Sequence, residues 1–325
     1  MRSSVSKAVV MERIGIPDSP DDGSISLPRQ YTRCVAFPSM PLIGLDSLLS
    51  SWARDEGAMI RRVILSRKGC DSAAGGCPSP ILPDGRLVPL PIPQAPPSTH
   101  RYRDLTLDGL RLADFLQRGG RARLHGNQSC HFDPQLDGSL GLLGQHGAAQ
   151  GELARHGVGV GDLFLFFGWF RSTSDRSGSG VHHLFGWLQV SQVIRGTDAI
   201  KAFLGAKNHR HPHSLGAVHG YRQNTLYVSE GGLMGSENPS RPPAFGRFRC
   251  QAPAFTLTEP GATRSRWRLP REVFDPSMEP FLNRLHWLEG DSTRVQPRGF
   301  GQEFILDSAR YPALADWARS LIASA

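Results

Sequence analysis

The sequence predicts a mixed, strand-rich α+β fold, with a single domain over residues 59–325. Short apolar runs outnumber amphipathic helical stripes along that part of the chain, and loops rich in proline and glycine separate them. At 325 residues, 39% apolar and 20% charged, the chain has the composition of a globular protein with room for one large domain or two ordinary ones. No internal repeat is visible, and we interpret residues 59–325 as one domain.

The strand signals are apolar runs of strand length bounded by turn residues. They lie at Arg62–Ser66, Leu87–Ile92, Asp162–Arg171, His182–Ile194, Thr225–Ser229, Ala254–Leu257 and Gln302–Leu306.

The two central strands are the most distinctive. Gly161-Asp162 leads into LFLFFGWF, which is apolar without alternation and therefore typical of a strand covered on both faces. A Ser/Gly/Arg loop follows, and then HHLFGWLQV with a glycine at its centre. This arrangement resembles the small curved barrels of the PUA and EVE type, which bind nucleobases. An ordinary buried hairpin is the alternative interpretation.

The helix signals are apolar residues at helical spacing with a glycine or a chain reversal after them. They lie at Leu105–Arg118, Ala148–His156, Asp198–Leu204 and Ser308–Ile322.

Residues 1–58 differ from the rest of the chain. They are rich in Ser, Pro and Asp, and Met59 directly precedes the first predicted strand. We expect this segment to be a disordered extension or the product of an upstream start codon. A genuine appendage of the family is the alternative.

Composition also limits the compartment and the partners. No apolar run approaches the roughly 18 residues that span a bilayer, and the N-terminus has no apolar signal region. Five cysteines without a CxxC pair disfavour a disulfide framework, so we expect a cytoplasmic protein. The net charge of +8 favours a nucleotide or DNA as the partner and gives no reason to expect a membrane.

The loop after the first strand holds the first candidate site. Ser66, Arg67, Lys68, Asp71 and Ser72 stand there, followed by two glycines. Cationic side chains bind phosphate, and glycines let backbone N–H groups approach an anion. The loop is neither a Walker loop nor a Rossmann fingerprint. A solvated turn is the alternative.

The segment CHFDPQLD holds the second candidate site. His131 and Asp133 are two residues apart and share one face of an extended chain, so they could act as base and orienting acid. His211 and His213 repeat this spacing downstream. An HxD motif followed by a distant histidine is also the pattern of two-His-one-carboxylate iron sites. Because such patterns arise easily by chance, we assign no metal ligand, and surface or capping roles are the alternative.

Two further segments carry amides and a carboxylate. Gln145 and Gln150 flank a small-residue helix start, where amides can read base edges. Gln302 and Glu303 enter the last strand, where Glu303 could serve as general acid or base. A tightly packed helix and a solvated edge strand are the alternatives.

Taken in order, the segments SRKGCDS, GGCPSPILPDGR, LPIP, HFDP, LGQHGAAQ, GDLFLFFGWF, HPH and GQEF resemble the nucleotide modification associated domain type 3 family. The resemblance runs from about Arg61 to the C-terminus, and the chain departs from it at Cys70 and Cys77. That family is associated with DNA base modification in phages and bacteria. The resemblance therefore implies a nucleotide or nucleic-acid role and one shared polar site.

We therefore predict an enzyme of nucleotide or DNA-base modification, with no cofactor assigned. The predicted catalytic residues are His131, Asp133, Asp71 and Glu303. The predicted nucleotide-binding residues are Ser66, Arg67, Lys68, Ser72, Gln145, Gln150, His211, His213 and Gln302. A non-catalytic PUA-like reader of modified bases and an iron-dependent oxygenase of the HxD…H type are the alternatives. The enzyme hypothesis requires these segments to meet in one cavity.

Overall fold

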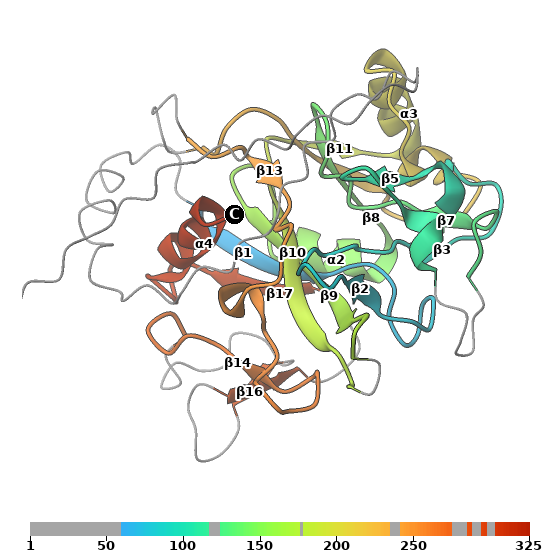
Figure 1. The fold of residues 1–325 in the computed structure, drawn as a ribbon. Coiled ribbons are helices and arrows are strands. Elements are labelled where there is room, and N and C mark those ends of the chain that lie inside the picture. The colour runs from blue at the N-terminus through green and yellow to red at the C-terminus, as the bar shows by residue number, and fades with distance from the viewer. Residues whose placement is uncertain are drawn as a thin grey trace, which may run out of the picture. The chain divides into compact units, whose positions relative to one another are not determined.

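The computed structural model describes residues 60–116, 124–175, 178–234, 241–274 and 303–325, with the backbone of two short strands at 285–287 and 294–297. The predicted extension, residues 1–58, lies outside the described residues, so the division at Met59 stays a prediction. Within the described part, three α-helices and several sheets form a strand-rich α+β fold (Figure 1). No helix there is both long enough and apolar enough to cross a membrane.

The largest sheet has the order β13-β10-β9-β1-β17, and β2 pairs with β9 beside this path. Its strands are β1 (Arg62–Arg67), β2 (Ser79–Ile81), β9 (Leu163–Ser172), β10 (Val181–Gln189), β13 (Phe245–Gly246) and β17 (Glu303–Asp307). The first strand, β1, runs parallel to β9 and antiparallel to β17. The first strand of the described chain and the last therefore lie side by side (Figure 1).

Both faces of this sheet are covered. Val63 and Leu65 of β1 pack on the side of α4 (Leu314–Ala323), whereas Ile64 packs on the side of α2 (Gly147–Arg155). All three side chains are fully buried. Burial on both faces explains why β1 and β9 are apolar without alternation.

A second sheet, of order β11-β12-β8, packs beside α2. It consists of β8 (Gly141–Gln145), β11 (Gln192–Arg195) and β12 (Thr225–Ser229), and α3 (Thr197–Ala206) packs against it.

Short strands complete the described fold. They are β3 (Ile92–Pro93), β4 (His100–Arg101), β5 (Thr106–Leu107), β6 (Leu110–Arg111), β7 (Ser129–His131), β14 (Trp267–Arg268), β15 (Leu285–Trp287) and β16 (Arg294–Pro297). The strand β7 pairs with both β3 and β4, and it ends at a predicted site residue, His131.

The structure confirms the predicted strands that became β1, β9, β12 and β17, and the helices that became α2 and α3. The segment His182–Ile194 forms two strands, β10 and β11, instead of one. The last helix begins at Leu314, six residues later than Ser308. The curved barrel core is not confirmed, because none of the described sheets closes on itself.

Three predicted elements are wrong. The segment Leu105–Arg118 contains the hairpin β5–β6 and a 3-10 helix, since Asp108-Gly109 adopts positive φ angles of 48° and 76° and turns the chain back. The segment Leu87–Ile92 contributes only Ile92 to a named strand and an isolated bridge at Leu87, because Pro89 and Pro91 have no N–H to donate. The segment Ala254–Leu257 follows Pro253 into a 3-10 helix.

Candidate metal centre

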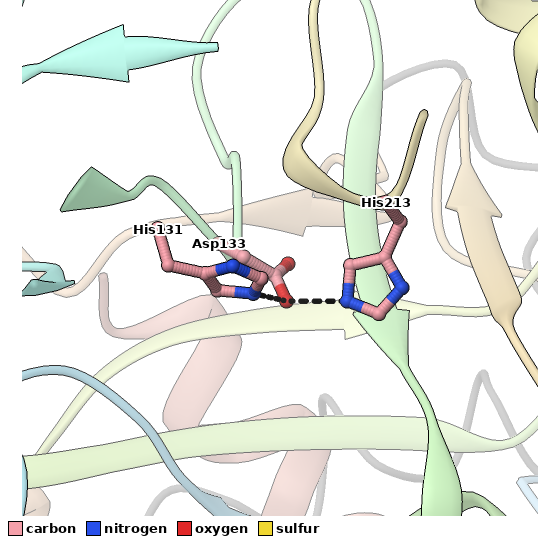
Figure 2. A group of neighbouring side chains, drawn as sticks. All are labelled: His131, Asp133 and His213. Atoms are coloured by element: carbon pink, nitrogen blue, oxygen red, sulfur yellow. Dashed lines mark ion pairs between the residues drawn. The ribbon is translucent and has the colours of Figure 1, made fainter. Parts of the chain in front are cut away.

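The buried carboxylate of Asp133 organises the candidate site. Its Oδ1 accepts a hydrogen bond from the backbone N–H of Gly144 at 3.0 Å and lies 3.2 Å from Nε2 of His211. Its Oδ2 lies 3.5 Å from Nε2 of His131 and 3.9 Å from Nε2 of His213. Figure 2 shows the second oxygen between these two imidazole rings. One oxygen is therefore held by fixed donors, and the other faces two ring nitrogens.

His211 fixes the orientation of this carboxylate. Its Nδ1 accepts the backbone N–H of His213 at 3.3 Å, within the first turn of the 3-10 helix Pro212–Leu215. A neutral imidazole that accepts at Nδ1 carries its proton on Nε2, so His211 donates that proton to Asp133. Both ring nitrogens of His211 are therefore occupied, and it is a positioning residue.

His213 is oriented in the opposite sense by Asn224. The Asn224 amide donates from Nδ2 to the hydroxyl of Thr197 and to the carbonyl of His213, both at 2.9 Å. Its Oδ1 is therefore the acceptor for Nδ1–H of His213 at 2.6 Å. Burial lowers the pKa of His213 well below its ordinary value, so the ring is neutral. Its Nε2 thus presents a lone pair toward Asp133.

Gly144 makes room for this ring. A Cβ built on Gly144 would overlap Cδ2 of the His213 ring, far inside van der Waals contact. The same residue supplies the N–H that holds Asp133. The end of β8 therefore needs glycine for both the carboxylate and the imidazole to occupy their places.

The three groups could hold one metal ion. Ligand atoms of His131, Asp133 and His213 all lie within 4.8 Å of one another. Ligand atoms at about 2.0–2.2 Å from one ion lie at most ~4.4 Å apart, and the distances from Oδ2 of Asp133 to the two imidazole nitrogens are shorter than this. Burial alone would raise the pKa of Asp133, but hydrogen bonds to His131 and His211 hold it well below the usual value. The carboxylate is therefore anionic, as a metal ligand must be.

A cavity of about 200 Å³ opens beside this cluster. Arg67, Lys68, Asp71, Gln145 and His146 contribute to its walls, together with the three candidate ligands. Segments from the loop after β1, from β7, from β8 and from the 3-10 helix at 212–215 meet there.

Lys68 is paired rather than free for a phosphate. Its Nζ donates to Oε1 of Glu303 at 3.0 Å, and Nε2 of Gln145 donates to the same oxygen. The other oxygen, Oε2 of Glu303, has no hydrogen-bond partner among the described residues. The same is true of the Ser66 hydroxyl, which stands opposite Glu303 in the β1–β17 register. Two unsatisfied oxygens thus lie at the strand ends next to the cavity.

Asp71 and Ser72 shape or flank the loop. Oδ1 of Asp71 accepts the N–H groups of Ala73 and Ala74, each at 2.7 Å, and Oδ2 lies 3.4 Å from Nη2 of Arg67. Asp71 therefore closes its own turn while lining the cavity. Ser72 is exposed and accepts from Arg264 at 3.2 Å, outside the cavity lining.

Two further predicted residues lie elsewhere. Gln150, on α2, is buried and accepts the Tyr227 hydroxyl at 3.1 Å; it does not line the cavity. Gln302 lies outside the described residues. Of the two glutamines expected to read a base, only Gln145 lies at the cavity.

Sequence reasoning missed four contributors: Gly144, His146, Tyr221 and Asn224. His146 lines the cavity and stacks on Tyr221, with ring centroids 3.9 Å apart and planes 3° apart. The position of His146 between two candidate glutamines was an available signal. The other three have none, because their roles depend on tertiary neighbours.

Comparison with known proteins gives one family. A family model described as nucleotide modification associated domain 3 matches residues 62–307. No curated protein and no solved structure matches the chain.

Proposed function

This chain belongs to the nucleotide modification associated domain 3 family, and from that premise we propose that it is a metal-dependent enzyme that modifies a nucleotide. One observation carries the proposal: His131, Asp133 and His213 bring three ligand atoms within 4.8 Å of one another at the wall of a cavity. Two imidazoles and one carboxylate leave positions open on a bound ion, and iron(II) oxygenases use this ligand set.

The bound ion would supply the reactive centre, and the chain's own residues prepare its ligands. Asp133 contributes the negative charge, held in place by Gly144 N–H and by His211. Asn224 keeps Nδ1 of His213 protonated, so that Nε2 is free. Such outer hydrogen bonds fix the tautomer and orientation of metal ligands.

Other residues at or beside the cavity provide the substrate contacts. Gln145 donates to Glu303 through Nε2, which leaves its Oε1 to accept from an amino group of a base. Glu303 has one unsatisfied oxygen, a candidate proton acceptor once substrate displaces Lys68. Arg67 lines the same cavity, where its guanidinium pairs with Asp71 and can also contact a phosphate.

No observation favours the non-catalytic reader. An aromatic cage needs ring faces open to a base, whereas Phe164, Phe166 and Phe167 of β9 are at most 1% exposed. The burial of these three rings therefore indicates that they pack in the core and do not form an aromatic cage.

Metal titration and product analysis test the proposal together. Metal-free protein is titrated anaerobically with iron(II), manganese(II) and zinc(II) in a calorimeter. Each loaded form is then incubated with nucleotides and DNA in air, and hydrolysates are analysed by mass spectrometry. We expect one ion per chain and a new nucleoside mass with at least one metal. Absence of stoichiometric binding, or unchanged masses with every metal, overturns the proposal.

A further inference from the structure

We propose that an arginine-lined groove beside the metal cavity binds the backbone of a single-stranded nucleic acid, so that the substrate is a base within a polymer. This inference rests on the proposed function, because it assigns the polymer to the same reaction centre. It concerns residues outside the metal cluster.

Residues of α2 line the groove. Two surface hollows, of about 710 and 390 Å³, lie along this helix and share Gly151, Arg155 and Gln223. Arg195 lines the larger hollow, and Arg222 lines the smaller. Because they share walls, we treat the two as one feature, the α2 groove, defined by these five residues.

The α2 groove has an excess of positive charge. Arg195 and Arg222 are exposed, and neither forms an ion pair with a described acidic residue. Arg155 pairs with Glu152, which is the acidic residue in the lining. Three guanidinium groups thus face a single carboxylate. Guanidinium groups bind phosphate oxygens through paired hydrogen bonds, which suits a run of phosphodiesters.

The groove adjoins the metal cavity through two residues. Tyr221 and Asn224 line the larger hollow. On its other side Tyr221 stacks on His146, which lines the cavity, and Asn224 holds the metal-facing His213. A chain lying in the groove therefore contacts two residues that themselves touch the lining of the cavity.

The volume of the cavity indicates that only the base of a nucleotide enters it. Its volume of about 200 Å³ is below the roughly 300–1,000 Å³ of pockets that enclose a drug-sized molecule. It can take a base, while the sugar and phosphates remain outside. A base that enters a buried cavity must leave the duplex stack, which costs least in a single strand.

Binding of a labelled oligonucleotide tests the groove. Fluorescence anisotropy is measured with a single-stranded DNA of about 12 bases, a length within the site size of such proteins. The double variant Arg195→Gln/Arg222→Gln is compared with Arg271→Gln, an exposed arginine of a segment that packs on the α4 side of the sheet. We expect at least ~10-fold weaker binding for the double variant only. Its slope of log affinity against log salt should fall by about 1.4, or ~0.7 per lost phosphate contact.

Three outcomes overturn the inference. They are unchanged oligonucleotide affinity in the double variant, an equal loss in Arg271→Gln, and competition by a nucleoside monophosphate as effective as that by the oligonucleotide. The last outcome identifies a free nucleotide as the ligand. Metal titration of the same variants separates the two proposals: normal metal binding with unaltered DNA binding rejects only the groove. If the double variant loses DNA binding and the wild-type protein takes up no metal, only the metal-dependent reaction is rejected.

Discussion

Two groups of buried histidines stand in this molecule, and they differ in what faces them. His182 and His183 lie in β10; Trp267 Nε1–H donates to Nδ1 of His182 at 3.0 Å, and Ala252 N–H donates to Nε2 of His183 at 3.3 Å. His213 is equally buried, but its Nε2 faces the carboxylate of Asp133 instead of an N–H donor. Burial lowers the pKa of His182, His183 and His213, so these three imidazoles are neutral. Only the second group keeps a lone pair directed at an anion, so burial alone does not identify a metal site.

The largest expected effect comes from removing that anion. Asp133→Asn keeps the shape of the side chain but removes the charge, so we expect metal affinity to fall more than ~100-fold, beyond the loss for an outer-shell partner. Asp162→Asn is the matched control, because Asp162 is also buried and pairs with Arg62 at 3.4 Å, away from the cluster. Calorimetric titration measures both. Metal affinity within a few-fold of wild type in Asp133→Asn would remove the distinction between the two histidine groups.

The second test displaces an imidazole without changing any ligand. In Gly144→Ala the new methyl group overlaps the His213 ring, so metal binding should weaken by more than roughly 100-fold while the protein still folds. Gly205→Ala in α3 meets no atom within 4 Å and should bind metal normally. Circular dichroism verifies folding in each. Equal metal affinity in the two variants contradicts the packing argument.

Acidification should destabilise the fold through the other group of buried histidines, His182 and His183. Burial lowers the pKa of His182 to about 3 and of His183 to about 4, from an ordinary 6.5. Below pH 6.5 the unfolded chain takes up protons that the folded chain does not, so the free energy of unfolding falls as pH falls. Between pH 7 and pH 5 we expect a loss of about 2 kcal/mol per histidine, measured by urea unfolding. His182→Gln should flatten this dependence, and the exposed His125→Gln should not; a flat wild-type profile would show that burial does not keep these rings neutral.

The smallest effect concerns the hydrogen bond that orients His213. Asn224→Ala removes the acceptor for Nδ1–H, and loss of such a partner typically lowers metal affinity about 10–100-fold. The exposed Asn127→Ala, which removes only an acceptor for Arg103, serves as the control. If Asn224→Ala binds metal like wild type, the tautomer of His213 is fixed by something other than this amide.

The fold and the site were predictable to different degrees. Apolar strands such as β9 can be predicted from the sequence, because burial on both faces requires a continuous apolar run. The spacing of His131 and Asp133 likewise indicated a shared face. The sequence does not show which of His211 and His213 is the candidate ligand, because both belong to one HPH motif. Only their hydrogen bonds distinguish the candidate ligand, His213, from the positioning residue, His211.

The site contacts that the sequence did not predict join residues far apart in the chain. Lys68 and Glu303 are 235 residues apart, and only the β1–β17 register brings them together. A lysine in a polar loop therefore looked free for phosphate. Nothing in the sequence separates Gln145 from Gln150. In the structure Gln145 ends β8, whereas Gln150 lies on α2 and bonds to Tyr227.

The pairing of β17 with β1 has a consequence for how the protein comes into being. All three candidate ligands precede residue 214, whereas Glu303 enters with the last strand. During synthesis, a growing polypeptide therefore carries the three candidate ligands long before Glu303, the acid that pairs with Lys68 at the cavity. A product that stops before residue 303 would therefore lack both the strand that pairs with β1 and the carboxylate that holds Lys68.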